Sequence, residues 1–144
     1  MMSVRHERVF KSLSAVASDV TGFGSSRLAA AVVLKGDIVS IGTNKRKTHP
    51  FQKQYSKNCH SIFLHAEISA IRNALRVLNA DDLKKATLYV CRMAYDNKHS
   101  QKMSMANACP CPGCMRAIVE FGFKDVIYSI DNGWKSLNEK HSKN

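Results

Sequence analysis

Hydrophobic residues recur at the spacing of an α-helix in three segments of the chain. In the middle segment, Ile68, Ile71 and Leu75 follow one another at intervals of three and four residues. The last segment begins at a proline and stops before Gly122, as helices commonly do. The pattern therefore predicts three amphipathic helices: residues 4–17, Ile62–Leu78 and Pro112–Phe121.

Runs of β-branched and other apolar residues predict five strands, each bounded by turn residues. These are Leu28–Leu34, Ile38–Ile41, Ala86–Met93, Val126–Ile130 and Trp134–Leu137. Lys35-Gly36-Asp37 joins the first two runs and Asp131-Asn132-Gly133 joins the last two, so each pair is predicted to form an antiparallel hairpin. The order of the elements predicts an α/β fold, in which one mixed sheet of about five strands is covered by helices.

Two polar stretches separate these elements. Residues 44–60 carry five lysines and arginines and no acidic residue, and the His49-Pro50 step is typical of a break in helical structure. We interpret this stretch as a long loop, which either is simply solvated or captures phosphate beside a site. The second stretch, residues 96–107, is turn-like and is interpreted as a hairpin or a flap.

Length and charge narrow the kind of protein. The 144 residues fit one domain, 1–144, and the excess of 22 Lys plus Arg over 11 Asp plus Glu favours an anionic partner such as a nucleotide or a nucleic acid. The longest apolar runs are far shorter than the ~20 residues of a membrane span. No apolar signal-peptide core follows the charged N-terminal segment. We expect a soluble, cytoplasmic protein that does not associate with membranes.

The cysteines indicate a metal site. Three of the five lie within residues 109–114, which suits reduced thiols better than a disulfide framework. Cys111 and Cys114 are spaced so that two thiolates can face one metal from the first turn of a helix, where the helix terminus also lowers thiol pKa values. His65 can add a third ligand. Three protein ligands leave one tetrahedral position open, which is typical of a catalytic zinc.

Glu67 follows His65 by two residues and is the candidate for moving protons between water and substrate. Residues two apart on a regular helix point in different directions. His65 and Glu67 can therefore share a pocket only if His65 lies at the very start of its helix.

The two motifs together, His65-Ala66-Glu67 and Pro110-Cys111-Pro112-Gly113-Cys114, resemble those of the zinc-dependent cytidine and deoxycytidylate deaminase superfamily. The resemblance covers roughly residues 28–130 and implies that family's three-layer α/β/α fold. It implies a Zn²⁺ cofactor held by His65, Cys111 and Cys114, with Glu67 as the general acid and base. Homo-oligomers are common among the relatives, so we expect one here.

The resemblance also implies a substrate site and a reaction. Asn44 would contact the sugar or another part of the substrate, and the backbone of Ala66 would meet the base. The expected substrate-binding residues are Asn44, Lys45, Lys47, Ala66 and Pro110. The implied reaction replaces the amino group of cytosine in a small nucleotide or nucleoside, with dCMP or CMP as the foremost substrates, and releases ammonia.

Two features depart from the nearest family patterns. Deoxycytidylate and tRNA adenosine deaminases pass almost directly from the third strand into Pro-Cys-x-x-Cys, whereas residues 95–107 are inserted here and could cap the pocket. Those relatives also place a helix between their last two strands, where this chain has a direct turn. The substrate is therefore less firmly indicated than the chemistry.

Other interpretations stay open at this level. The substrate could be a base within single-stranded DNA or RNA, including a tRNA adenosine, or the domain could be a non-catalytic zinc-binding scaffold. Cys59 or Cys109 could close the zinc site as a fourth ligand, and Cys59-His60 could form a second metal site. Cys91 is interpreted as a small core residue, and Trp134 as a packing residue or an oligomer contact.

Overall fold

The computed structural model of the chain describes residues 4–20, 27–44, 65–96, 102–131 and 133–137. These residues form a mixed sheet of six strands in the order β2-β1-β3-β5-β6, with β4 paired to β3 beside this path. The strands are β1 (Arg27–Leu34), β2 (Asp37–Thr43), β3 (Thr87–Tyr95), β4 (Met103–Ala106), β5 (Asp125–Ile130) and β6 (Gly133–Ser136). The helices are α1 (Val4–Ser18), α3 (Ala66–Ala74), α4 (Ala80–Leu83) and α5 (Pro112–Phe121). Within these ranges every helix is too short or too polar for a membrane span.

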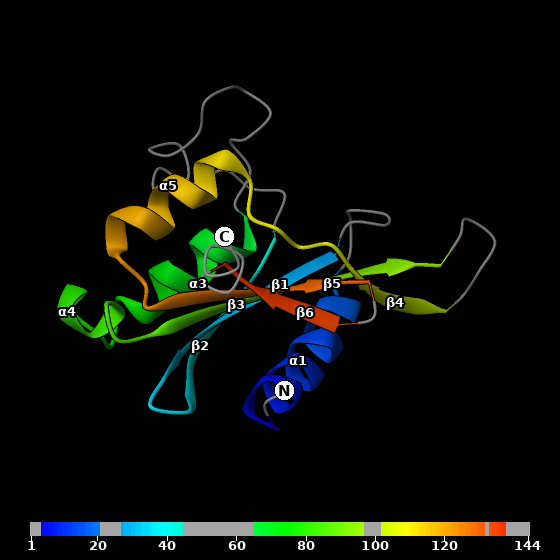
Figure 1. The fold of residues 1–144 in the computed structure, drawn as a ribbon, viewed down its shortest axis with the longest axis horizontal. Coiled ribbons are helices and arrows are strands. Elements are labelled where there is room, and N and C mark those ends of the chain that lie inside the picture. Colours follow the sequence, from blue (N-terminus) through cyan, green and yellow to red (C-terminus); the bar gives the residue numbers. More distant parts are fainter. Residues whose placement is uncertain (1–3, 21–26, 45–64, 97–101, 132, 138–144) are drawn as a thin grey trace, which may run out of the picture.

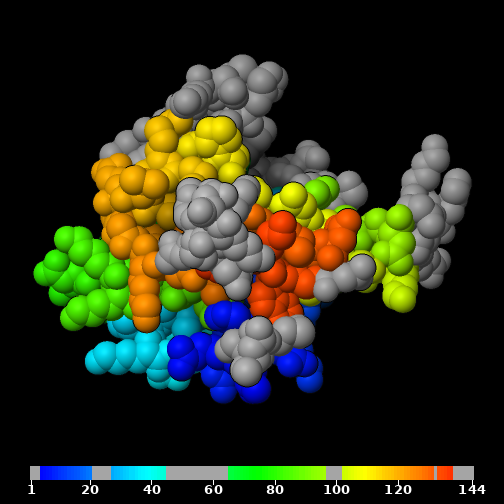
Figure 2. All heavy atoms as spheres, viewed as in Figure 1, coloured from blue at the N-terminus to red at the C-terminus, as the bar shows by residue number. Residues whose placement is uncertain are grey.

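Helices cover both faces of the sheet, as the predicted three-layer architecture requires. Figure 1 shows α1 on one side of the strands and α3 with α5 on the other. In the space-filling view, the blue atoms of α1 lie at the bottom and the yellow to orange atoms of α5 at the upper left (Figure 2). Side chains of alternate residues of β3 pack against the helices on opposite faces of the sheet. Tyr89 and Cys91 pack in the cluster with α1, whereas Leu88 and Val90 pack in the cluster with α3 and α5.

Both predicted hairpins are confirmed. β1 and β2 pair antiparallel around a turn in which Lys35 and Gly36 have φ angles of 54° and 85°, the left-handed conformations of a two-residue hairpin turn. β5 and β6 pair antiparallel with no intervening helix. On the edge strand β6, Trp134 stacks on Phe10 of α1 with ring centroids 5.1 Å apart, which agrees with a packing role for this tryptophan.

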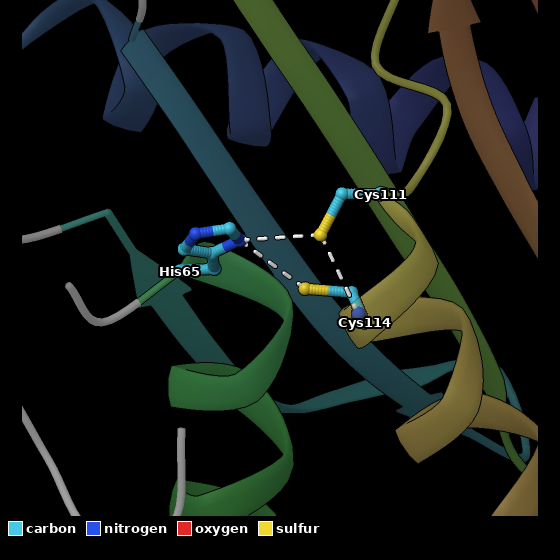
Figure 3. Close-up of side chains that lie close together, drawn as sticks. All are labelled: His65, Cys111 and Cys114. Carbon is cyan, nitrogen blue, oxygen red and sulfur yellow. Dashed lines mark hydrogen bonds between the residues drawn. The ribbon is translucent and has the colours of Figure 1, made fainter. Parts of the chain in front are cut away.

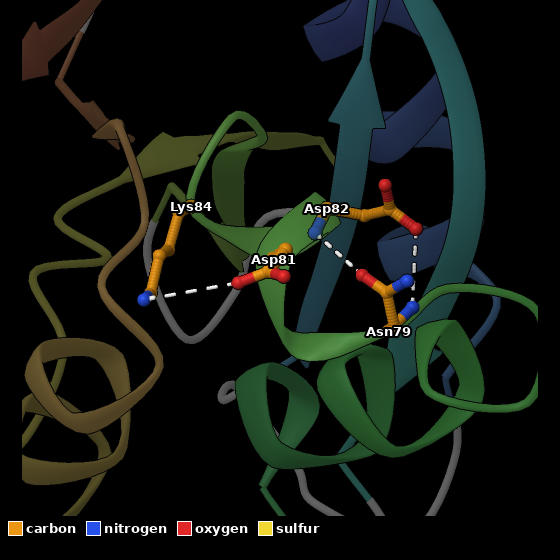
Figure 4. A network of polar contacts seen from close by, with 4 residues as sticks. All are labelled: Asn79, Asp81, Asp82 and Lys84. Carbon is orange, nitrogen blue, oxygen red and sulfur yellow. Dashed lines mark hydrogen bonds and ion pairs between the residues drawn. The ribbon is translucent and has the colours of Figure 1, made fainter.

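The second helix is shorter than its periodicity predicts. α3 ends at Ala74 instead of continuing to Leu78, and residues 62–64 lie outside the described ranges. A separate helix, α4, begins at Asn79, which forms a capping box with Asp82: Asn79 Oδ1 accepts from the Asp82 N–H at 2.9 Å, and Asp82 Oδ2 accepts from the Asn79 N–H at 3.1 Å (Figure 4). This short helix follows the predicted segment Ile62–Leu78, at residues for which the apolar spacing predicted no helix. The exposed Lys84–Asp81 pair in the same figure, at 3.9 Å, adds little stability.

The stretch interpreted as a hairpin or flap contains a sixth strand. β3 runs on to Tyr95, and β4 pairs with it antiparallel from Arg92↔Ala106 to Tyr95↔Met103. Ser104 Oγ donates to Asp96 Oδ1 at 2.6 Å beyond the paired residues. Met103 and Met105 pack in the cluster with α1, but a strand of four residues is too short for its alternation of apolar and polar positions to identify it from the sequence.

One glycine sets how closely α3 approaches the sheet. A Cβ at Gly42 of β2 would lie 2.3 Å from the backbone nitrogen of Ala70 and 2.7 Å from the carbonyl oxygen of Ala66. Around this contact Ser40 Oγ donates to the Ala70 carbonyl at 2.7 Å, and Asn73 Nδ2 donates to the Ile41 carbonyl at 3.0 Å. The first turn of α3 is thereby fixed against the end of β2.

Candidate metal centre and active site

The first turns of two helices meet on one face of the sheet. His65 is the N-cap residue of α3, with extended backbone angles (φ −84°, ψ 156°), and Cys111 is the N-cap residue of α5, where Pro112 occupies the first helical position. Figure 3 shows the side chains of His65, Cys111 and Cys114 converging between these two helix starts. The condition that His65 must precede the regular helix is met.

The three side chains fit a zinc ion. His65 Nδ1 lies 3.6 Å from Cys111 Sγ and 3.4 Å from Cys114 Sγ, and all three ligand atoms lie within 4.8 Å of one another. In a tetrahedral site with Zn–S and Zn–N bonds of about 2.3 and 2.1 Å, a sulfur and a nitrogen ligand are about 3.6 Å apart. Within the described ranges no fourth Cys, His, Asp or Glu joins this cluster. Cys59, considered above as a fourth ligand, lies outside the described residues.

Hydrogen bonds and the position of Cys111 at a helix N-terminus favour the thiolate form, which binds metal cations. The Cys114 N–H donates to Cys111 Sγ at 3.5 Å. Hydrogen bonding from the Cys114 thiol, from His65 and from that N–H lowers the pKa of Cys111 to about 3, against the effect of burial. The neighbouring Cys111 thiolate and burial raise the pKa of Cys114. Hydrogen bonding to Cys111 raises the pKa of His65. Such coupling concentrates negative charge at the position that a divalent ion would take.

Glu67 lies in the first turn of α3, two residues after His65, and is buried with 4% of its surface exposed. Burial raises the pKa of its carboxyl group, whereas hydrogen bonding from backbone and from Cys114, together with the charge of His65, lowers it. The interaction with Cys114 brings this carboxyl group beside the ligand cluster. Ala66, between the two functional residues, packs against the sheet with 1% exposure.

The other predicted substrate residues divide into two groups. Asn44 is buried at the end of β2, and its Oδ1 accepts from the Leu28 N–H at 3.0 Å, so part of this side chain supports the start of β1. Pro110 is buried directly before Cys111. Lys45 and Lys47, with the rest of the basic stretch, lie outside the described residues, as does the Cys59-His60 pair considered for a second metal.

The two remaining described cysteines stand apart from the metal ligands. Cys91 is fully buried in the core against α1, as its place in a β-rich run predicted. Cys109 is exposed and does not join the ligand cluster, so the described residues do not support it as a fourth ligand.

Sequence reasoning missed two residues near the site. Ser129 of β5 is fully buried; its Oγ accepts from the Arg92 N–H at 3.0 Å and donates to the Ala106 carbonyl at 2.7 Å, while its own carbonyl accepts from the Ala108 N–H at 2.9 Å. The bonds to Ala106 and Ala108 fix the segment that connects β4 to Cys111. The second is Arg92 itself. A single charged residue inside the apolar run Ala86–Met93 was the signal that could have identified it.

Comparisons with known proteins agree with this geometry. The family model described as "Cytidine and deoxycytidylate deaminase zinc-binding region" matches residues 3–130. The apo structure of the dCMP deaminase from cyanophage S-TIM5 is similar in fold, with a TM-score of 0.56 and 22% identity over 91% of this chain and 87% of that chain. The structure of the same phage enzyme in complex with dCMP and dUMP is similar with a TM-score of 0.56 and 21% identity, over 89% of this chain and 82% of that chain. A comparison with curated protein sequences gave no significant match. The chain belongs to the cytidine and deoxycytidylate deaminase family and contains its zinc-binding region.

Proposed function

We propose that this protein catalyses the zinc-dependent hydrolytic deamination of cytosine in a small nucleotide, dCMP or CMP, to give dUMP or UMP and ammonia. The observation that carries the proposal is the buried Glu67 carboxyl group beside the cluster of His65, Cys111 and Cys114. A structural zinc site is closed by a fourth protein ligand and needs no adjacent buried carboxyl group. This argues for an enzyme over a non-catalytic scaffold.

In the proposed reaction, Glu67 is the general acid and base. Zinc held by His65, Cys111 and Cys114 would supply a Lewis acid that acidifies the attacking water. Glu67 accepts a proton from the water as the oxygen bonds to C4 of the ring, and delivers it to the ring nitrogen N3. It then takes the remaining proton from the hydroxyl group now on C4 and delivers it to the departing amine, so that the C4 carbonyl forms as the C4–N bond breaks; one water is consumed and one ammonia leaves. The burial of Glu67 keeps these protons from exchanging with bulk solvent during the transfer.

The proposed substrate contacts extend from this centre. Asn44 is assigned to the sugar, the backbone of Ala66 and the ring of Pro110 to the base, and Lys45 and Lys47 to the phosphate. The similar phage enzyme was crystallised with dCMP and dUMP, which supports a deoxyribonucleoside monophosphate as the first substrate to test. We also expect a homo-oligomer, which sedimentation velocity measures.

One cluster of positive charge among the described residues is not placed to hold the alternative substrate, DNA or RNA, at the metal centre. Four cationic side chains, those of Arg5, Lys35, Lys85 and Lys124, line a cavity of about 160 Å³. This cavity includes Tyr89, whose side chain lies on the α1 face, and the N-terminal end of β3. It is thus on the other face of the sheet from the helices that carry the metal ligands, and a strand bound there would not lead into that centre.

A substrate panel tests the proposal. Zinc-loaded protein is incubated with dCMP, CMP, deoxycytidine, cytidine and short cytosine-containing oligonucleotides, and loss of cytosine absorbance is followed together with ammonia release. We expect turnover of a monophosphate in preference to the oligonucleotides. Turnover of oligonucleotides alone would favour the alternative, and the absence of turnover of every free pyrimidine would refute the proposal.

A further inference from the structure

Arg92 lies on the face of the sheet that carries the metal centre. Its neighbours along β3, Cys91 and Met93, both pack in the cluster with α1. Because successive side chains of a strand point to opposite faces, the side chain of Arg92 belongs to the face covered by α3 and α5.

The strand register gives its position relative to α3. Gly42, against which the first turn of α3 rests, pairs with Ala30 of β1, and Ala30 pairs with Val90 of β3. Two residues from each of these positions, toward the same end of the sheet, Asn44, Leu28 and Arg92 lie side by side across the three strands and form the next row on this face. The Leu28 N–H donates to Asn44 Oδ1, and Leu28 pairs with Arg92. Arg92 therefore shares a row with the residue assigned to the sugar.

The strand on the other side of Arg92, β4, is connected to α5, the second helix that carries metal ligands. On the side away from β1, Arg92 pairs with Ala106 at the end of β4. From there the chain runs through the buried Ala108 to Cys111, the N-cap residue of α5. The backbone of Arg92 is held from both sides and by the Ser129 hydroxyl, so its side chain starts from a rigid position between the two helix starts.

The guanidinium group of Arg92 is not fully satisfied. Its Nε is buried and has no hydrogen-bond partner, and among the described residues no carboxylate forms an ion pair with it. Buried charged groups in proteins are ordinarily paired, because an uncompensated charge removed from water is unfavourable. A guanidinium held in this way beside a binding site is suited to an oxyanion, in particular to phosphate.

We propose that Arg92 binds the phosphate group of the nucleotide substrate and makes the enzyme prefer monophosphates to nucleosides. This inference rests on the proposed function, because it takes dCMP or CMP as the ligand. It adds a specificity-determining residue from β3 to the contacts assigned to the basic stretch, and it gives that residue a role distinct from the proton transfers of Glu67.

Steady-state kinetics of four proteins test the inference: the wild type, Arg92→Gln, Arg92→Lys, and Lys85→Gln as a control. The control removes the same charge from an exposed residue just before the other end of β3. For Arg92→Gln we expect kcat/KM for dCMP to fall about 10- to 100-fold through KM, with deoxycytidine changed less than about twofold. Arg92→Lys should recover part of the loss, and Lys85→Gln should match the wild type. Equal losses for dCMP and deoxycytidine, or no loss for either, would overturn the assignment.

Calorimetric binding of dUMP and deoxyuridine separates this inference from the proposed activity. If the wild type binds dUMP but deaminates no cytosine compound, the proposed function fails. The role of Arg92 is then tested by binding alone: Arg92→Gln should weaken the binding of dUMP and leave the binding of deoxyuridine unchanged. If the wild type binds neither dUMP nor dCMP, both proposals fail. Zinc content and thermal melting of each variant verify that it is folded.

Discussion

The Nδ1 of His65 lies 3.4 Å from the Sγ of Cys114, although 49 residues separate them in the chain. Each side chain extends from the first turn of a different helix, and both helices rest on the same face of the sheet. This distance suits two ligands of one tetrahedral zinc ion. The fold therefore creates the metal centre by bringing two helix N-termini together.

The ligand assignment predicts which cysteine variants lose metal. Cys111→Ser and Cys114→Ser each remove a thiolate, so bound zinc measured by plasma mass spectrometry should fall from about one ion per chain to near zero. Cys91→Ser is the matched control, because Cys91 is buried in the other core cluster, and it should retain its zinc. Full zinc occupancy in Cys114→Ser would rule out the proposed ligand set.

The contact between Gly42 and α3 predicts a large effect of one methyl group. Gly42→Ala places a Cβ against backbone atoms that cannot rotate away, so we expect the free energy of unfolding to fall by about 2–3 kcal/mol. Gly133→Ala is the control, because a Cβ there meets no atom within 4 Å. Urea denaturation measures both. Equal stability of the two variants would show that α3 does not depend on this close approach.

Asn44 has a structural contact that can be separated from its assigned role toward the sugar. Asn44→Ala removes the acceptor of the Leu28 N–H and should destabilise the fold by about 1–3 kcal/mol. Asn44→Asp keeps an oxygen acceptor but loses the amide donor. We therefore expect a raised KM for dCMP in Asn44→Asp, measured on protein that urea denaturation shows to be folded. A normal KM for dCMP in this variant would show that the Asn44 amide does not contact the substrate.

The cysteines should differ in reactivity. Burial raises the pKa of Cys91 from its ordinary value of 9.0 to about 12, whereas Cys109 is exposed. Iodoacetamide at pH 8, followed by peptide mass spectrometry, should modify Cys109 in the native protein and Cys91 only after unfolding. Labelling of Cys91 at the rate of Cys109 would contradict its burial.

The same raised pKa gives a pH dependence of stability. Below pH 9 the Cys91 thiol is protonated in both the folded and the unfolded chain, so its contribution is fully present. As the pH rises from 9 toward 12, only the unfolded chain loses this proton, and stability falls. Cys91→Ala should show a shallower fall over that interval than the wild type in urea denaturation.

Much of the fold could be predicted because its signals are local. Turn residues such as Lys35-Gly36-Asp37 and apolar runs such as that of β1 act within a few positions of the chain. The end of α3 could not be predicted, since Leu75 and Leu78 continue the apolar spacing beyond Ala74, where the helix ends. The helix α4, capped by Asn79, was not predicted. The hairpin interpretation of residues 96–107 is confirmed by the pairing of β3 with β4, but the bounds of β4 could not be predicted, because four residues are too few for a reliable alternation.

The metal ligands could be predicted because each lies in a short motif, His65-Ala66-Glu67 or Pro110-Cys111-Pro112-Gly113-Cys114, and the two motifs together resemble those of the deaminase family. Arg92 could not, because its significance arises from the pairing of three distant segments, β1, β3 and β4. The support that Ser129 gives to the chain before Cys111 depends likewise on tertiary hydrogen bonds. Sequence spacing identifies groups that act through local motifs and misses those positioned by the sheet.

The central claim is that Glu67 transfers the protons of a deamination at the zinc centre. Glu67→Gln preserves the size of the side chain and removes its ionisable group, so we expect zinc to remain bound while kcat for dCMP falls about 10²- to 10⁴-fold. The decisive measurement is ammonia release from dCMP by wild type and Glu67→Gln, both verified to contain one zinc per chain. Loss of turnover with zinc retained is the predicted result; wild-type turnover in the zinc-loaded variant would contradict the account.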